Sequence, residues 1–120
     1  MSGQIWLGAE SAGGLALPAA APTATQFYAP RGVFLNDEWF VVADSGNHRV
    51  LIWPGRPERD REPAAVVVGK GDFFSEGCGL LHLPTGVAIV DGMLMVADSW
   101  HHRILVWKCL PTASGAAPDF

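Results

Sequence analysis

Short apolar runs, separated by polar turns that carry glycine and proline, recur along this chain. The clearest pair of runs is Trp39–Ala43 and His48–Trp53, with the polar cluster Asp44–Asn47 between them. Both runs are rich in β-branched and aromatic residues, and the cluster consists of turn formers. This pattern predicts two antiparallel strands joined by a short loop.

The same pattern returns later in the chain at a constant offset of 54 residues, as from Asp44 to Asp98. Aligned without a gap, residues 30–53 and 84–107 are identical at 12 of 24 positions, so the chain contains an internal repeat. Further strands are predicted at Pro30–Leu35, Ala64–Gly69, Pro84–Val90, Met93–Ala97 and His102–Trp107.

Consecutive apolar residues such as Val41 and Val42 leave these strands without a solvated face, which favours sheets sandwiched between neighbours. Four-stranded antiparallel units that repeat and pack face to face are the blades of a β-propeller. The sequence therefore predicts an all-β protein with two propeller blades in this chain.

The repeat divides the chain into five parts. Ile5–Gly8 resembles Val66–Gly69, so residues 1–8 are predicted to be an outer strand that completes a neighbouring blade. Residues 9–29 read as an Ala/Pro-rich loop, 30–69 as the first blade, 70–83 as a Gly-rich loop, and 84–120 as a second blade whose outer strand is missing.

The repeated residues resemble the NHL repeat family. The resemblance rests on Pro30–Val33 and Val42–Val50, and again on Pro84–Val87 and Val96–Ile104. The pattern from Val68 to Phe73 is similar to the outer strand and following loop of bacterial members. The resemblance implies a propeller, commonly six-bladed, that serves as a rigid scaffold for binding proteins or small ligands.

Two blades alone would leave two large apolar faces exposed, so a stable monomer is not expected. One possibility is a homotrimer, in which three copies join head to tail into six blades and Gln4–Gly8 of each completes the last blade of its neighbour. A segment of a longer propeller is the second possibility. A truncated or engineered fragment without activity of its own is the third.

Composition removes several classes of partner. The chain of 120 residues has a net charge of −4 and only 8 Lys and Arg, which disfavours nucleic acid and anionic membrane as partners. It has no apolar run of about 18 residues or more and no basic residue before Arg31, so neither a membrane span nor a signal peptide is expected. A cytoplasmic location is favoured over secretion, with Cys78 and Cys109 as free thiols.

The polar residues of the repeat are expected to be structural rather than catalytic, because both copies carry them. Asp44 and Asp98 should accept backbone N–H groups at the turn and pair with Arg49 and Arg103 across it. No catalytic residue, metal or cofactor is predicted; adjacent histidines on one strand would face opposite ways and could not share an ion. The structural motif comprises Asp44, Asn47, His48 and Arg49, and its second copy Asp98, His101, His102 and Arg103, while His82 lies outside it.

Binding is predicted at the mouth of the channel, at Arg31, Thr85 and Trp100. Arg31 and Thr85 stand between the proline and the glycine of each copy, and three Arg31 side chains around a ring could hold an anion or an acidic partner segment. Trp100 replaces Gly46 at the loop tip and is either packed on a neighbour or displayed as an anchor. The alternative function is a hydrolase or lyase with a metal-assisted site on the axis; an exposed aromatic patch near Trp100 would favour binding instead.

Overall fold

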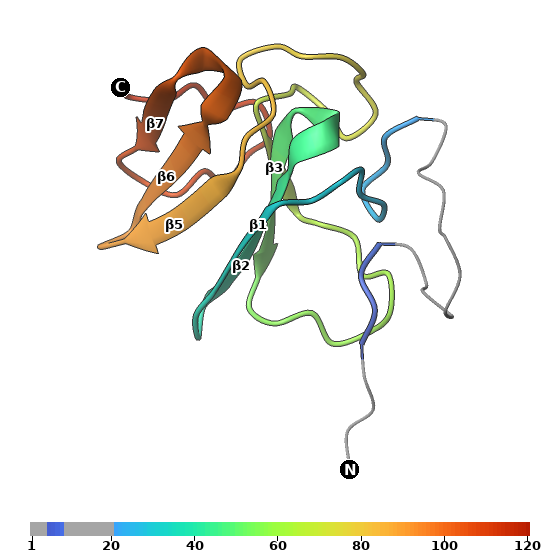
Figure 1. Cartoon of the computed structure of the whole chain (residues 1–120). Helices are drawn as coiled ribbons and strands as arrows, with labels where there is room; N and C mark the ends of the chain where they lie inside the picture. Colours follow the sequence, from blue (N-terminus) through green and yellow to red (C-terminus); the bar gives the residue numbers. More distant parts are fainter. Residues whose placement is uncertain (1–4, 9–20) are drawn as a thin grey trace.

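The chain folds into two antiparallel β-sheets, which confirms the all-β prediction (Figure 1). The computed structural model describes residues 5–8 and 21–120, and this part contains no α-helix, hence none that could span a membrane. The elements are β1 (Gly32–Leu35), β2 (Trp39–Asp44), η1 (Ser45–Asn47), β3 (Arg49–Pro54), β4 (Val66–Val68), β5 (Gly86–Val90), β6 (Met93–Asp98), η2 (Ser99–His101) and β7 (Arg103–Trp107).

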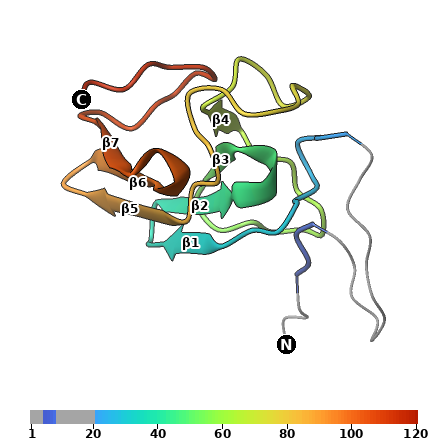
Figure 2. The same cartoon turned by 45° about the horizontal axis from the view of Figure 1, so that its top comes forward.

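The first sheet has the strand order β1-β2-β3-β4 and the second the order β5-β6-β7 (Figure 2). Local turn chemistry explains the inner hairpins. In the first, the Oδ1 of Asn36 accepts hydrogen bonds from the backbone N–H groups of Glu38 and Trp39, at 2.8 and 2.7 Å. In the second, Asp91 and Gly92 both have positive φ, 50° and 77°, as a tight Asp-Gly hairpin requires.

The two sheets pack face to face and share the main core. One face of the first sheet lies against one face of the second, and the connecting loop adds Leu81. The buried members of this cluster are Val41, Val50, Ile52, Val66, Val68, Leu81, Leu94, Val96, Leu105 and Trp107. Burying such side chains is worth about 1.5–3 kcal/mol each, so this interface is a main source of stability.

The far faces of the two sheets differ. On the first sheet, Val42, Leu51 and Trp53 are covered by a second cluster that includes Leu7 and Phe27. On the second sheet the far face is open, and Ile104 is 59% exposed. The prediction that the strands with Val41–Val42 and Val50–Ile52 lack a solvated face is confirmed for β2 and β3. In β6, by contrast, buried and half-buried residues alternate.

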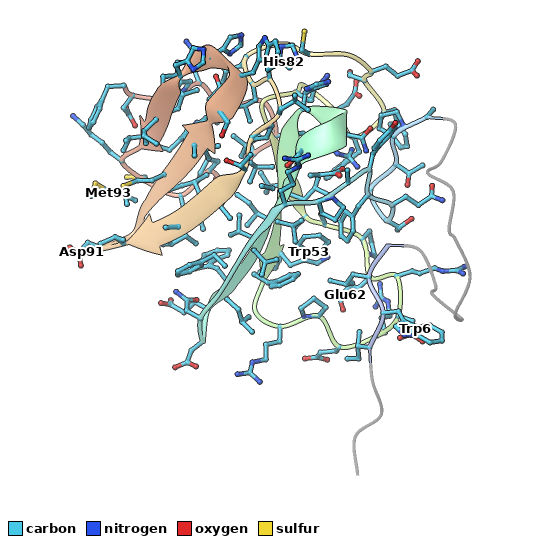
Figure 3. All side chains as sticks on the ribbon, in the orientation of Figure 1. Trp6, Trp53, Glu62, His82, Asp91 and Met93 are labelled. Atoms are coloured by element: carbon cyan, nitrogen blue, oxygen red, sulfur yellow. The ribbon has the colours of Figure 1, made fainter. Side chains whose placement is uncertain are left out.

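Residues 5–8 form no strand within this chain. They run beside the loop after β3: the N–H of Trp6 donates to Asp60 Oδ1 at 2.8 Å, and the N–H of Arg61 donates to the carbonyl of Trp6 at 2.7 Å. Trp6 accordingly lies near Glu62 in Figure 3. Pairing of this segment with another chain stays a prediction, and most of the predicted loop 9–29 lies outside the described residues.

The second sheet has three strands in the part of the chain that the structure describes, and residues 119–120 lie beside β7 without forming a fourth strand. The N–H of Asp119 donates to the carbonyl of Val106 at 2.8 Å, as the N–H of Ala65 donates to that of Ile52 at 2.9 Å in the first sheet. The N–H of Val106 also donates to the carbonyl of Phe120 at 2.5 Å. Phe120 thus pairs with Val106 at the position that Val66, the first residue of β4, takes beside Ile52 in the first sheet.

Candidate binding face

The turns between the second and third strands of each sheet lie at one end of the molecule, and an aspartate organises each turn. Asp44 is fully buried at the end of β2. Its Oδ1 accepts the backbone N–H of Tyr28 at 2.7 Å, while its Oδ2 accepts the side chains of Asn47 at 2.9 Å and Arg49 at 2.8 Å. This one carboxylate therefore joins the turn, β3 and the loop that precedes β1.

Arg49 is also fully buried, and it extends the network to two loops. Its terminal nitrogens donate to the carbonyls of Phe73 at 2.7 Å, Thr23 at 2.6 Å and Gln26 at 2.9 Å. A buried guanidinium with one carboxylate and three carbonyl partners has its donors committed to the fold. The Asp44–Arg49 pair therefore holds the loops together and offers no free charge to a ligand.

The second copy repeats this arrangement with one difference. Asp98 accepts the N–H of His82 at 2.8 Å, His101 Nδ1 at 2.7 Å and Arg103 Nε at 2.8 Å. Burial, the largest single effect, raises the pKa of Asp98, but the three hydrogen bonds together bring it below its usual value. The difference is that the Arg103 side chain is 44% exposed, whereas that of Arg49 is buried.

The left-handed residue of each turn is the histidine before the third strand. His48 has φ 54° and His102 has φ 57°, and the N–H of each closes the 3-10 turn onto a serine carbonyl. The prediction that His101 and His102 are adjacent residues of one strand is wrong, because His101 ends η2 and His102 takes the left-handed backbone before β7 begins.

The replacement of Gly46 by Trp100 follows from the residue that faces the turn. A Cβ at Gly46 would lie 2.4 Å from Cδ1 of Tyr28 and 2.5 Å from its carbonyl oxygen, so only glycine fits there. In the second copy the smaller His82 stands in the place of Tyr28. A side chain at position 100 is thereby accommodated, and the indole lies beside the imidazole with ring centres 5.3 Å apart and planes tilted by 32°.

His82 lies at the centre of a ring cluster at this end of the molecule (Figure 3). Its ring centre is 4.7 Å from that of His48 and 5.8 Å from that of His101. The Nδ1 of His48 accepts the N–H of Leu83 at 3.1 Å, which places the proton of the neutral ring on Nε2. Burial, then His82 and Lys70, lowers the pKa of His48. The indole of Trp100, at the edge of the cluster, is 61% exposed.

Arg31 and Thr85 stand at the starts of β1 and β5, at the same end of the sheets as the turns. Arg31 is exposed and its N–H donates to the carbonyl of Ala43 at 3.1 Å. Thr85 is half-buried, and its hydroxyl is hydrogen-bonded to that of Ser99. The roles of Arg31, Thr85 and Trp100 in binding stay predictions.

Sequence reasoning missed Tyr28, which lines a cavity of about 180 Å³ beside η1 with Gly46, Asn47, His48 and Glu76. Its position, 54 residues before His82, was the available signal.

Other candidate chemistry finds no support in the geometry. In residues 5–8 and 21–120, no three His, Cys, Asp or Glu side chains are arranged to hold a metal ion. Lys70, in the glycine-rich loop, is buried and its ammonium donates to the carbonyl of Gly77 rather than facing an open phosphate site. Cys78 and Cys109 are exposed and form no disulfide with each other.

Residues 81–107, which contain β5, β6 and β7, match the family model described as NHL repeat. A search of the curated proteins finds no match.

Proposed function

Because residues 81–107 match the NHL repeat model, we propose that the chain is a binding scaffold of the β-propeller type rather than an enzyme. Its two sheets are then neighbouring blades, and six blades form the complete ring. The partner binds at the end that carries η1 and η2, here called the turn face. This face comprises Arg31, Thr85, His82, Trp100, His101 and His102.

The exposure of Trp100 is the observation that carries this proposal. The indole leaves 61% of its surface in water and lies beside the imidazole of His82, and tryptophan is enriched among the residues that carry binding energy at protein interfaces. The groups beneath it are committed to the fold, since Asp98 accepts three hydrogen bonds and Arg103 donates to the carbonyl of Leu80 at 2.8 Å. Among the described residues no buried side-chain nitrogen or oxygen lacks a partner. The hydrogen bonds of the turn thus hold Trp100 in a fixed place with its ring exposed.

The partner that fits this face is an acidic segment of a protein. Arg31 is exposed, and His101 and His102 present imidazoles at the same end, so the groups around Trp100 are mainly donors and potential cations. An extended segment with carboxylates and an aliphatic or aromatic side chain could pair with Arg31 and rest on the indole. The negative net charge of the whole chain, −4, weakens long-range attraction, so short-range contacts should dominate.

Fluorescence anisotropy with a labelled peptide of alternating glutamate and leucine tests this function, with a lysine–leucine peptide as the charge control. Trp100→Gly introduces the residue that the first copy has at Gly46 and keeps the turn. We expect Trp100→Gly and Arg31→Ala each to weaken binding about ten-fold, as loss of a central anchor does. Arg56→Ala, at the opposite end, is the matched control and should bind as the wild type does.

The proposal fails if the lysine peptide binds as tightly as the glutamate peptide, or if Trp100→Gly leaves the affinity unchanged.

A further inference from the structure

The repeat relates the two faces that meet inside this pair of sheets to the two faces outside it. Within the chain, Val41, Val50 and Ile52 of the first sheet pack against the second sheet, where Val87 and Ile89 of β5 contact the shared core. Moved by the repeat offset of 54, the first set becomes Met95, Ile104 and Val106, on the open face of the second sheet. Val87 and Ile89 become Val33 and Leu35, which are 66% and 47% exposed on the far face of the first sheet, beside the residues that its own loops cover. The exposed parts of the two outer faces are therefore related as the two inner faces are.

Three contacts define how one sheet seats on the next. A Cβ at Gly32 would lie 2.4 Å from the carbonyl oxygen of Thr85, so the two backbones touch there. The hydroxyl of Ser45 donates to the carbonyl of Pro84, and the N–H of Leu83 donates to His48 Nδ1 at 3.1 Å. Gly32, Ser45 and His48 of the first copy thus contact the segment Leu83–Thr85, which leads into β5.

The open face carries the equivalents of these three residues, Gly86, Ser99 and His102, and in the separate chain the hydroxyl of Ser99 is hydrogen-bonded to that of Thr85. A Cβ at Gly86 would meet only Ala97 Cβ, at 3.5 Å, an ordinary contact. This part of the sheet has a shallow hollow of about 320 Å³, which is lined by Gly86, Val87, Ala88, Met95, Ala97 and Ile104. By the repeat offset, the segment that fits here is Ala29–Arg31, which corresponds to Leu83–Thr85.

The N-terminal segment occupies the place of an outer strand that belongs to a preceding sheet. Gly8 has φ 76°, and a Cβ added there would lie 2.7 Å from Cδ2 of Phe27. Gly69 has φ 95°, and a Cβ added there would lie 2.8 Å from Cδ1 of Leu81. Phe27 and Leu81 are themselves repeat equivalents. Residues 5–8 therefore lie on the first sheet much as the end of β4 lies beside the second.

The outer edge of β7 is correspondingly incomplete. Phe120 pairs with Val106 as Val66 pairs with Ile52, but in the described residues no strand continues beside Leu105 and Ile104. Alignment at the closing glycine makes Trp6 and Leu7 the equivalents of Val67 and Val68, the residues that continue β4. An unpaired edge next to an apolar face is a template for a further strand.

We propose that the open face of the second sheet binds the first sheet of a second copy of this chain, head to tail. The backbone of Ala29–Arg31 of the incoming copy lies on Gly86, and its residues 6–8 extend along the edge of β7 from the point where Phe120 pairs with Val106. The contact is heterologous, and three copies close it into six blades. This inference rests on the proposed propeller and adds the partner that completes it.

Gly86→Val tests the proposed contact between Gly86 and an incoming copy without disturbing the fold of the single chain. The added side chain has room beside Ala97 but would meet the carbonyl of Arg31 in an incoming copy. Gly71→Val is the matched control, because a Cβ at Gly71 meets nothing within 4 Å. Both variants and the wild type are examined by size-exclusion chromatography with light scattering, with circular dichroism to verify the fold.

We expect three times 12.8 kDa for the wild type and Gly71→Val, and a folded species of 12.8 kDa for Gly86→Val. A wild type that is a folded monomer, or a heterogeneous aggregate, would overturn the inference. The open face would then be the binding site for a further blade of a longer chain. A trimer that survives Gly86→Val would overturn it too. Binding of the glutamate peptide by monomeric protein would leave the proposed function standing while the assembly fails.

Discussion

The two aspartates of the repeat make the same bonds in different surroundings, so removing each charge should cost a different amount. Asp44→Asn leaves the guanidinium of Arg49, fully buried, without a counter-charge. Removing one partner of a buried pair costs about 3–5 kcal/mol. Asp98→Asn leaves Arg103 with a side chain that is 44% exposed, so water can solvate the charge. That substitution should cost about 1–2 kcal/mol, the worth of the weakened hydrogen bonds.

Urea unfolding followed by tryptophan fluorescence measures both costs. A free energy of unfolding of about 5–15 kcal/mol is typical, so Asp44→Asn would remove a large share and Asp98→Asn a modest one. If Asp44→Asn does not fold, the double variant Asp44→Asn/Arg49→Met removes both charges and should recover folding, because the isolated charge is the main penalty. Equal losses for the two single variants, or a double variant less stable than Asp44→Asn, would refute the reasoning.

Two further substitutions probe the contact between the sheets. Gly32→Ala should destabilise the protein by about 1–3 kcal/mol in urea, because its Cβ would press on the carbonyl of Thr85; Gly71→Ala should change stability by less than about 0.5 kcal/mol, and similar values would mean that the sheets are not in contact there. The lowered folded-state pKa of His48 means that its contribution is complete above the unfolded value of about 6.5 and is lost as the pH falls below it. His48→Asn, which tolerates the left-handed backbone, should flatten the dependence of the unfolding free energy on pH below about 6.5; an unchanged slope would contradict this contribution of His48.

Much of the fold could be predicted because the same pattern of strands and turns occurs twice in the sequence. One offset of 54 residues, from Asp44 to Asp98, relates both hairpins, and the structure keeps the register: Asp44 is opposite Arg49 and Asp98 opposite Arg103. Side-chain type also located the turns. It could not locate the left-handed residue, since φ is a property of the backbone and several residues of the turn could adopt it. The recurrence of histidine at His48 and His102 was the only hint.

The candidate face was less predictable, because its contacts come from segments outside the aligned copies. Tyr28 and His82 supply the N–H groups that the aspartates accept, from the loop before the first strand of each sheet and 16 residues away along the chain. The exposure of Trp100 depends on which of those two residues faces the turn. No periodic pattern carries that information, so the choice between a packed and a displayed indole had to await the three-dimensional arrangement.

The unequal burial of the two arginines follows from the unequal covering of the two sheets. Arg49 is enclosed because the loops through Thr23 and Phe73 meet over it, and their carbonyls accept its terminal nitrogens. Arg103 has only Leu80 among the carbonyls of the described residues. A copy docked on the open face would bring the next set of loops towards Arg103. The cost of Asp98→Asn should then rise towards that of Asp44→Asn as protein concentration increases, and a cost that stays the same from dilute to concentrated solution would contradict the proposed assembly.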